Sequence, residues 1–171
     1  MTTESPRFLP WVAAARTGDR AAWNALHAHF APGVHAVALA HGPHATADDV
    51  VQETFARAME KLPTLREDAA FGGWLHAIAR NLATSAVRRR RRFTLLPERL
   101  FAPARPTAEA NEALEAIRGL PEAYSELLMM RLVEGLTGPE IAEQLGRTQG
   151  SVRVTLHRGM KLLREALGEA P

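Results

Sequence analysis

Apolar residues recur along this chain at every third or fourth position, which is the spacing of one face of an α-helix. Segments that alternate apolar and polar residues with the period of a β-strand are almost absent, and β-branched residues seldom cluster. The sequence therefore predicts an all-α fold. Its 171 residues are enough for one medium domain or for two small helical ones.

Turn and capping residues divide the first part of the chain into five predicted helices, which cover residues 9–16, 19–31, 33–41, 46–62 and 71–92. Pro32 permits the start of a separate third helix, which we expect to run through Val34, Val37 and Leu39 and to end at Gly42-Pro43. Thr46 and Asp49 have the spacing of a capping box, which predicts the start of the fourth helix.

The composition changes after residue 92. Residues 93–107 contain three prolines and show no sustained period, which predicts a partly extended linker. Two further helices are expected beyond it, at residues 108–117 and 121–133. The sequence thus predicts two small helical domains, residues 1–92 and 108–171, joined by this proline-containing linker.

Residues 137–167 have the pattern of a helix-turn-helix. The segment opens with a capping box, Gly146 supplies the turn, and Ala142 and Val152 are expected where the two helices cross. The outward residues of the second helix suit base edges and phosphates, so we predict that they bind duplex DNA. They are Arg147, Thr148, Gln149, Ser151, Arg153, Thr155 and Arg158. The alternative is a helical hairpin whose basic face is merely solvated.

Charge is unevenly distributed, although the formal net charge is only +2. Residues 67–92 and 146–164 are basic, and residues 93–126 between them are net acidic. This pattern favours two separate phosphate-facing surfaces over a uniformly basic coat. The five consecutive arginines at 88–92 could be a solvated helix end, but the aromatic and basic residues before them favour binding to melted DNA. For Phe71 and Trp74 themselves, core packing is the simpler interpretation.

Several classes of protein are excluded or disfavoured. The chain contains no cysteine, which excludes disulfides, thiolate zinc sites and cysteine nucleophiles. The histidines at 27–44 lack the i, i+4 spacing of helical zinc ligands, although His41 and His44 flank a turn and could meet. No catalytic constellation is visible, so we expect no enzyme, no cofactor and no metal. We also see no signal peptide and no apolar run long enough for a membrane span, and we expect a cytoplasmic protein without membrane insertion.

The chain resembles the extracytoplasmic-function (ECF) sigma factors of the sigma-70 superfamily. Residues 48–55, Asp-Asp-Val-Val-Gln-Glu-Thr-Phe, and residues 71–83, which begin Phe-Gly-Gly-Trp-Leu-His, are similar to region 2 of that family. Residues 120–136, 140–146 and 150–158 are similar to region 4. The resemblance implies a subunit that directs the RNA polymerase core to specific promoters, helps to melt them, and has no enzymatic activity of its own.

The same resemblance implies roles for individual residues. Asp48, Asp49, Gln52 and Glu53 would dock on the β′ clamp helices of the polymerase core, and region 4 would contact the β flap. The loop at residues 66–70 would capture the melted −10 element together with Arg80, Asn81, Arg88, Arg89 and Arg91. The helix-turn-helix would read the −35 element in duplex form, and the linker would pass near the polymerase active centre.

Two points stay open at the level of the sequence. An anti-sigma factor is compatible with the resemblance, but no residue requires one. The alternative function is a stand-alone helix-turn-helix regulator whose residues 1–92 form a sensing or dimerisation domain. Such a regulator has no need of the docking helix at residues 48–55, so that helix favours the sigma factor.

The arginine run can be tested through the salt dependence of DNA binding. Replacing Arg88, Arg89 and Arg91 together by glutamine should flatten the plot of log affinity against log salt, by about 0.7 for each single-strand phosphate that is no longer neutralised. The measurement is fluorescence anisotropy of the polymerase-bound chain on melted promoter DNA across a salt series. An unaltered slope would show that the run is a solvated helix end.

Overall fold

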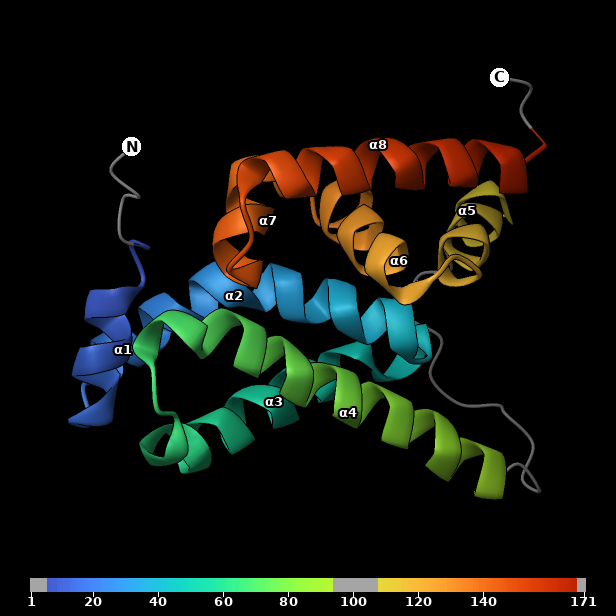
Figure 1. Ribbon diagram of the computed structural model, residues 1–171. Coiled ribbons are helices and arrows are strands. Elements are labelled where there is room, and N and C mark those ends of the chain that lie inside the picture. The colour runs from blue at the N-terminus through green and yellow to red at the C-terminus, as the bar shows by residue number, and fades with distance from the viewer. Residues whose placement is uncertain (1–5, 94–107, 169–171) are drawn as a thin grey trace.

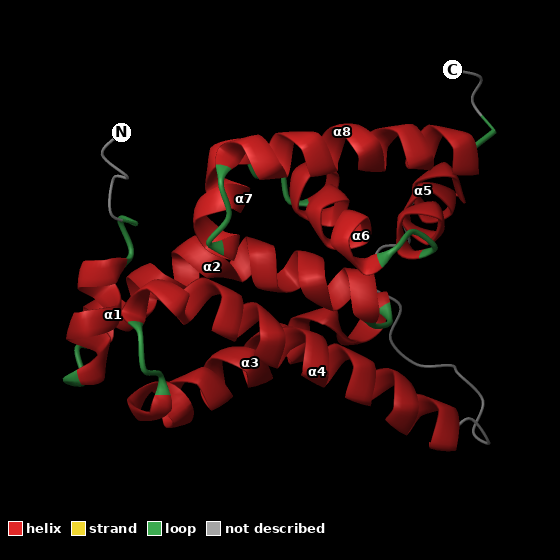
Figure 2. Cartoon of the chain, in the orientation of Figure 1, coloured by secondary structure: helices red, strands yellow, loops and turns green. Residues whose placement is uncertain are grey.

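The computed structural model describes residues 6–93 and 108–168, and within these ranges all regular secondary structure is helical, which confirms the predicted fold class (Figure 2). The elements are α1 (Leu9–Arg16), α2 (Arg20–His41), η1 (His44–Thr46), α3 (Ala47–Lys61), η2 (Leu62–Thr64), η3 (Asp68–Ala70), α4 (Phe71–Phe93), α5 (Ala108–Arg118), α6 (Glu122–Leu128), η4 (Met129–Val133), α7 (Gly138–Leu145) and α8 (Gln149–Ala166). The predicted linker, beyond its first residue, lies outside the described residues.

The helices form two layers that meet along α2 (Figure 1). We call residues 6–93, with α1 to α4, the N-terminal half, and residues 108–168, with α5 to α8, the C-terminal half. α2 packs against α1, α3 and α4 within its own half, and against α6 and η4 of the other. The two halves are therefore in direct contact, and α2 packs against helices of both.

Three phenylalanines from distant parts of the sequence form the centre of the N-terminal half. The ring centroid of Phe30 in α2 lies 5.2 Å from that of Phe8 and 5.2 Å from that of Phe71. All three side chains are fully buried. Trp74 packs against Phe71 at 5.8 Å and is only partly buried. These contacts agree with the core interpretation of both aromatic residues.

Pro32 does not separate two helices, so that prediction is wrong. α2 continues through it from Arg20 to His41 and ends at Gly42. An interior proline removes one backbone hydrogen bond. The helix on both sides of Pro32 is nevertheless buried, with Phe30 before it and Val34 after it fully covered. Burial of apolar surface on both sides offsets the loss of that bond.

The predicted capping box at Thr46 is also wrong. The hydroxyl of Thr46 donates to the carbonyl oxygen of Pro43 at 3.0 Å, and it accepts no backbone N–H of α3. Thr46 ends the short 3₁₀ turn η1, and its own backbone conformation is not extended as a capping threonine requires. The acidic residues that follow remain in the first turn of α3, where the helix dipole favours them.

The helix predicted at residues 121–133 is divided into α6 and a π-helical turn. The backbone N–H of Glu134 donates to the carbonyl oxygen of Met129 at 3.2 Å, five residues earlier. Four consecutive residues just before and within this turn, Leu127 to Met130, are almost completely buried. Such a run is buried all round because α8 lies on one side of it and α2 on the other. The turn therefore sits where the two halves meet.

Two glycines allow the halves to approach closely around Gln144 of α7. A Cβ atom on Gly33 would overlap the side chain of Gln144, and a Cβ on Gly72 would overlap its backbone carbonyl oxygen. The Gln144 side chain is 1% exposed, and its Nε2 donates to the carbonyl oxygen of His29 at 2.8 Å. A polar side chain of the C-terminal half thus inserts between α2 and α4.

This close approach predicts unequal effects for two neighbouring substitutions. Gly72→Ala places a methyl group against backbone that cannot move aside, so it should lower the free energy of unfolding by about 1–3 kcal/mol or separate the halves. Gly73→Ala is the matched control, because a Cβ there meets nothing within 4 Å and alanine is the better helix former. Urea denaturation and small-angle scattering measure the two outcomes. Parent-like stability and dimensions for Gly72→Ala would contradict this close packing of Gly72 on Gln144.

Candidate nucleic-acid interface

The helix-turn-helix is held at its N-terminal end by the capping box that the sequence predicts. Thr137 Oγ1 accepts from the backbone N–H of Glu140 at 3.4 Å, and the Glu140 carboxylate accepts from the backbone N–H of Thr137 at 2.8 Å. The Thr137 hydroxyl also donates to the Glu140 carboxylate at 2.7 Å, and this bond, together with the one from the Thr137 backbone N–H, holds the pKa of Glu140 below its usual range. Gly146 then adopts the left-handed conformation, with φ +62°, that glycine tolerates best. The turn is therefore built as the residue pattern indicates.

The second helix of the motif, α8, is fixed by its own cap and by its packing. Thr148 Oγ1 accepts from the backbone N–H of Ser151 at 3.2 Å. Val152 is fully buried, and Ala142 on α7 is 4% exposed where the two helices cross. Gly159 allows a similarly close crossing with α6, because a Cβ there would contact Leu128 and Tyr124. α8 is thus held rigidly along one side.

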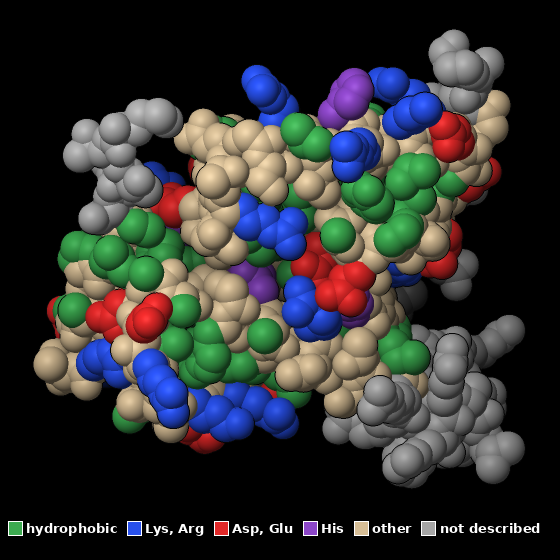
Figure 3. Space-filling model, in the orientation of Figure 1, with side chains coloured by type: hydrophobic (Ala, Val, Ile, Leu, Met, Phe, Trp, Pro, Cys, Tyr) green, Lys and Arg blue, Asp and Glu red, His purple; other side chains and the backbone are tan. Residues whose placement is uncertain are grey.

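The other side of α8 and the turn before it are exposed and carry the predicted duplex-binding residues. We call these residues the reading face: Arg147, Thr148, Gln149, Ser151, Arg153, Thr155 and Arg158. All are exposed except Thr155, which is half-buried and donates its hydroxyl to the carbonyl oxygen of Ser151 at 2.9 Å. Figure 3 shows basic side chains gathered over α8 on the outer edge of the molecule. The N-terminal half does not cover this surface.

The predicted polymerase-binding residues lie on α3, in the opposite layer. We call Asp48, Asp49, Gln52 and Glu53 the docking face, and all four are exposed. Glu53 pairs with Arg57 at 2.7 Å within the same helix. Asp48 lies 3.7 Å from the Nε2 of His35, although its side chain is 98% exposed. The docking face is therefore acidic and accessible, away from the basic reading face.

The loop at residues 66–70 is anchored by a residue that the sequence did not single out. Arg16, at the end of α1, donates from Nε to the Asp68 carboxylate at 3.0 Å. It also donates to the carbonyl oxygens of Leu62 and Leu65 before the loop. One guanidinium thus ties the loop to the residues that precede it. Such long-range hydrogen bonds leave no periodic signal in the sequence.

The residues predicted to bind melted DNA have different environments. Asn81 is exposed on α4, where its carbonyl oxygen accepts from the hydroxyl of Ser85 at 2.7 Å. The backbone of α4 continues to Phe93, so Arg88, Arg89 and Arg91 belong to this helix, but their side chains lie outside the described residues. Arg80 is half-buried and is engaged by the C-terminal half.

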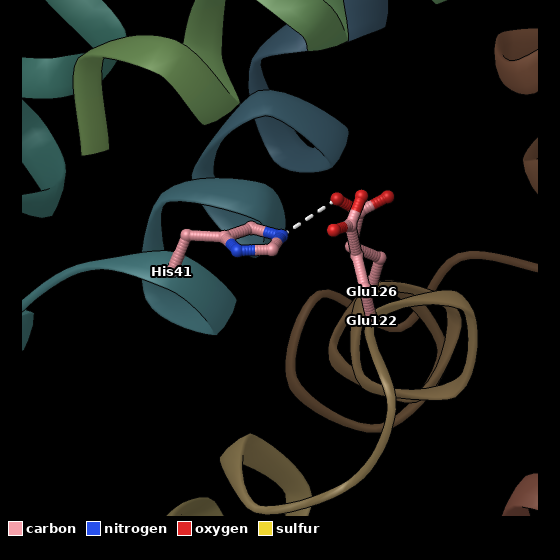
Figure 4. A group of neighbouring side chains, drawn as sticks. All are labelled: His41, Glu122 and Glu126. Atoms are coloured by element: carbon pink, nitrogen blue, oxygen red, sulfur yellow. Dashed lines mark hydrogen bonds and ion pairs between the residues drawn. The ribbon is translucent and has the colours of Figure 1, made fainter. Parts of the chain in front are cut away.

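Arg80 forms a forked ion pair with Glu126 of α6. Its Nε and Nη2 donate to the two carboxylate oxygens at 2.7 and 2.9 Å, and its Nε also lies 2.9 Å from a carboxylate oxygen of Glu122. His41 Nε2 lies 2.7 Å from Glu126 Oε1 (Figure 4). Burial alone would raise the pKa of Glu126, but the hydrogen bonds from His41 and Arg80 hold it down at about 2. The hydrogen bonds between Arg80 and Glu126 also raise the pKa of Arg80.

His41, Glu122 and Glu126 are close enough to hold a metal ion, since their donor atoms all lie within 4.8 Å of one another (Figure 4). The guanidinium of Arg80 already pairs with both carboxylates, so it occupies the oxygens that a cation would need. We therefore interpret this group as an ion-pair network between the halves. The acidic stretch at residues 93–126 was the sequence signal for this network. The sequence did not predict which basic residues its carboxylates pair with. His44, the other candidate of the sequence pair, is exposed.

Among the described residues, no helix is long and apolar enough to cross a membrane.

Family comparisons match both halves of the chain. The sigma-70 region 2 family matches residues 26–93, and the family described as sigma-70, region 4 matches residues 110–163. These ranges contain the docking face, Arg80 and Asn81, and most of the helix-turn-helix.

Curated relatives match along most of the chain. It is 32% identical over 172 residues to the ECF RNA polymerase sigma factor SigE of Mycolicibacterium smegmatis, an alignment that covers 90% of this chain and 65% of that protein. It is 33% identical over 184 residues to the ECF RNA polymerase sigma factor SigD of Mycobacterium tuberculosis, covering 98% of this chain and 87% of that one.

Solved structures are similar in fold. CnrH in complex with the cytosolic domain of CnrY has a TM-score of 0.60 at 24% identity, and the match covers 95% of this chain and 98% of that chain. The sigma factor RpoE in complex with the anti-sigma factor NepR from Bartonella quintana has a TM-score of 0.51 at 21% identity, over 83% and 94% of the two chains.

Proposed function

This chain belongs to the ECF sigma factors of the sigma-70 family, and from that premise we propose that it directs RNA polymerase core to specific promoters and helps to melt them. In this role it is a non-enzymatic transcription initiation subunit that works in the cytoplasm with the polymerase. Its proposed domains are region 2 at residues 1–92, a linker at 93–107, and region 4 at 108–171.

The observation that carries the proposal is the exposure of two unlike faces on one chain. The docking face on α3 is acidic, and the reading face on α8 is basic and polar. They lie in opposite layers of the molecule (Figure 1). A protein partner and a DNA duplex can therefore be bound at the same time. A stand-alone regulator needs only the second face.

The reading face suits the −35 element in duplex form. A capped, rigidly packed helix can enter the major groove with its N-terminal residues toward the base edges. Arg153 can fork onto guanine and Gln149 onto adenine, each pair giving roughly 1–3 kcal/mol of discrimination. The arginines at either end of the face, Arg147 and Arg158, are suited to phosphates, which position the helix without reading sequence.

The −10 element is proposed to bind along α4 in melted form, at Arg80, Asn81, Arg88, Arg89 and Arg91, beside the loop at residues 66–70. Basic side chains would hold the backbone while bases leave the stack. Arg80 is now paired with Glu122 and Glu126 of the C-terminal half. Its DNA role therefore requires the two halves to separate.

Protein partners follow from the same proposal. The docking face would bind the β′ clamp helices, and region 4 would bind the β flap. Two of the solved structures of similar fold are complexes, one with the cytosolic domain of CnrY and one with the anti-sigma factor NepR. We include an anti-sigma factor among the proposed partners of this chain on that basis.

Run-off transcription tests the proposal directly. Core polymerase, this chain and genomic DNA fragments should together yield transcripts with defined start sites, and neither protein alone should do so. Duplex binding that is equally tight and specific without polymerase, together with no transcripts, would support the stand-alone regulator in place of the sigma factor.

One prediction concerns base reading by α8. Arg153→Ala should weaken binding to the cognate −35 duplex by roughly 5- to 150-fold, because a bidentate contact to one base pair contributes about 1–3 kcal/mol. Lys161→Ala is the control, since this exposed cation lies further along α8 and should contribute only weakly and without sequence preference. Anisotropy on cognate and scrambled duplexes measures both. Unchanged preference for the cognate duplex in the Arg153 variant would remove it from the reading face.

A second prediction concerns polymerase binding by α3. Asp49→Ala should weaken the affinity for core polymerase roughly fivefold, or by about 1 kcal/mol, because it removes one charge from an exposed docking face. Glu60→Ala removes an equally exposed carboxylate from the far end of the same helix and should bind like the parent. Surface plasmon resonance gives the affinities, and circular dichroism confirms intact helices. Equal losses in both variants would mean that only net charge matters.

A further inference from the structure

Histidines of α2 face carboxylates of the C-terminal half at three places along the helix. His29 lies 3.7 Å from Glu143. The other two contacts are hydrogen-bonded, with His35 Nδ1 at 2.6 Å from Glu134 and His41 Nε2 at 2.7 Å from Glu126. The interface between the halves therefore places imidazole rings against carboxylates at three points. We call the His35–Glu134 and His41–Glu126 pairs the clasp.

His35 has an acidic neighbour at each ring nitrogen. Glu134, which follows η4, accepts the hydrogen bond at Nδ1, and Asp48 of α3 lies 3.7 Å from Nε2. Their carboxylates favour the protonated ring. The hydrogen bond to Glu134 raises the pKa of His35 above its ordinary value of 6.5, with burial acting against it. Both partners are largely covered, with 28% and 17% of the side chains exposed.

His41 belongs to the network that covers Arg80. The charged groups around it are Glu126 and Glu122 of α6, and Arg80 of α4. From α5, Arg118 donates to the carbonyl oxygen of Leu39 at 2.8 Å, close by on α2. The clasp and the Arg80 ion pairs thus share one carboxylate, Glu126. A change that moves α6 away from α2 therefore also breaks the ion pair between Arg80 and Glu126.

We propose that closure of the two halves is governed by pH, because the clasp is strongest when His35 is protonated between Glu134 and Asp48, keeps Arg80 covered, and weakens as the pH rises above neutrality. The consequence for Arg80 rests on its proposed role in binding melted DNA. The closed arrangement is then an inhibited state of the free chain, in which region 4 covers Arg80 of region 2.

The direction and the pH window follow from the individual histidines. Because the closed state holds the pKa of His35 above 6.5, this contribution to closure is complete below about pH 6.5 and is lost as the pH rises through the raised value. Above pH 6.5, His35 is the group whose raised pKa sets the trend.

Two other histidines limit closure on the acid side. Burial lowers the pKa of His76, which lies near Glu126 and Arg80, to about 4. Burial also lowers the pKa of His29, with Glu143 and Glu140 acting against it and Arg7 acting with it. If separation of the halves exposes these rings, they take up protons more readily in the open state than in the closed one. Acid therefore favours the open state as the pH falls below about 6.5 toward 4. Closure is therefore strongest near pH 6.5 and weakens on both sides.

The test measures the separation of the halves in the full-length free chain. The protein has no cysteine, so Ala56→Cys on α3 and Ala166→Cys on α8, both exposed, give two unique sites for a fluorescent donor and acceptor. Energy transfer is recorded from pH 6.5 to 8.5 at constant ionic strength. We expect transfer to fall, with the ratio of closed to open molecules decreasing roughly threefold to tenfold.

Two histidine variants show whether the clasp is responsible. His35→Gln keeps a hydrogen-bonding side chain but cannot titrate, so the fall in energy transfer should largely disappear. His157→Gln is the control, because this histidine is exposed on α8, and the fall should persist. Equal falls in the parent and in His35→Gln, or constant transfer across this pH range in the parent, would overturn the proposal.

Binding of single-stranded DNA provides the functional readout. The probe is a fluorescein-labelled oligonucleotide of about ten nucleotides, within the usual site size. Histidine deprotonation ordinarily weakens DNA binding, because positive charge is lost. The clasp predicts the opposite, a higher affinity at pH 8 than at pH 6.5, and no such rise in Arg80→Gln. A rise of the same size in Arg80→Gln would refute the covering of Arg80, whereas failure of transcription with polymerase would leave the energy-transfer result intact.

Discussion

The arrangement of the two halves depends on the buried carboxylate of Glu126. Its side chain is only 7% exposed, and burying an unpaired carboxylate costs several kcal/mol. Arg80 and His41 from the other half pair with it through three hydrogen bonds. The C-terminal half can therefore keep Glu126 out of water only while it remains packed on α2 and α4. Separation is possible because water can solvate the released charges.

This dependence divides the surfaces of the chain into two groups. The docking face and the reading face are exposed while the halves are together, so polymerase binding and duplex reading are compatible with the closed arrangement. DNA binding by Arg80 is not compatible with the closed arrangement, because the same guanidinium cannot pair with Glu126 and with a DNA strand at the same time. Capture of the melted element would then be the step that opens the molecule. Such an order would keep the free chain from holding single strands before a promoter is found.

Local sequence patterns predicted most of the helices and the helix-turn-helix, because these depend on neighbouring residues. The capping box at Thr137 and the turn at Gly146 are present as expected. Pro32 misled because tertiary burial holds α2 together across it, and Thr46 misled because its hydroxyl turns back to Pro43. The contacts between the halves could not be predicted from the sequence. They join residues such as Arg80 and Glu126, 46 positions apart, and no periodicity records which acid meets which base.

We propose that one chain binds polymerase while it reads a promoter as duplex at one end and as single strand at the other. Permanganate footprinting of a cognate promoter detects this behaviour, since permanganate oxidises unpaired thymines. With core polymerase and this chain together, we expect reactive thymines in the −10 element and protection of the −35 element from nuclease. The same protection without polymerase, and no reactive thymine when both proteins are present, would contradict the claim.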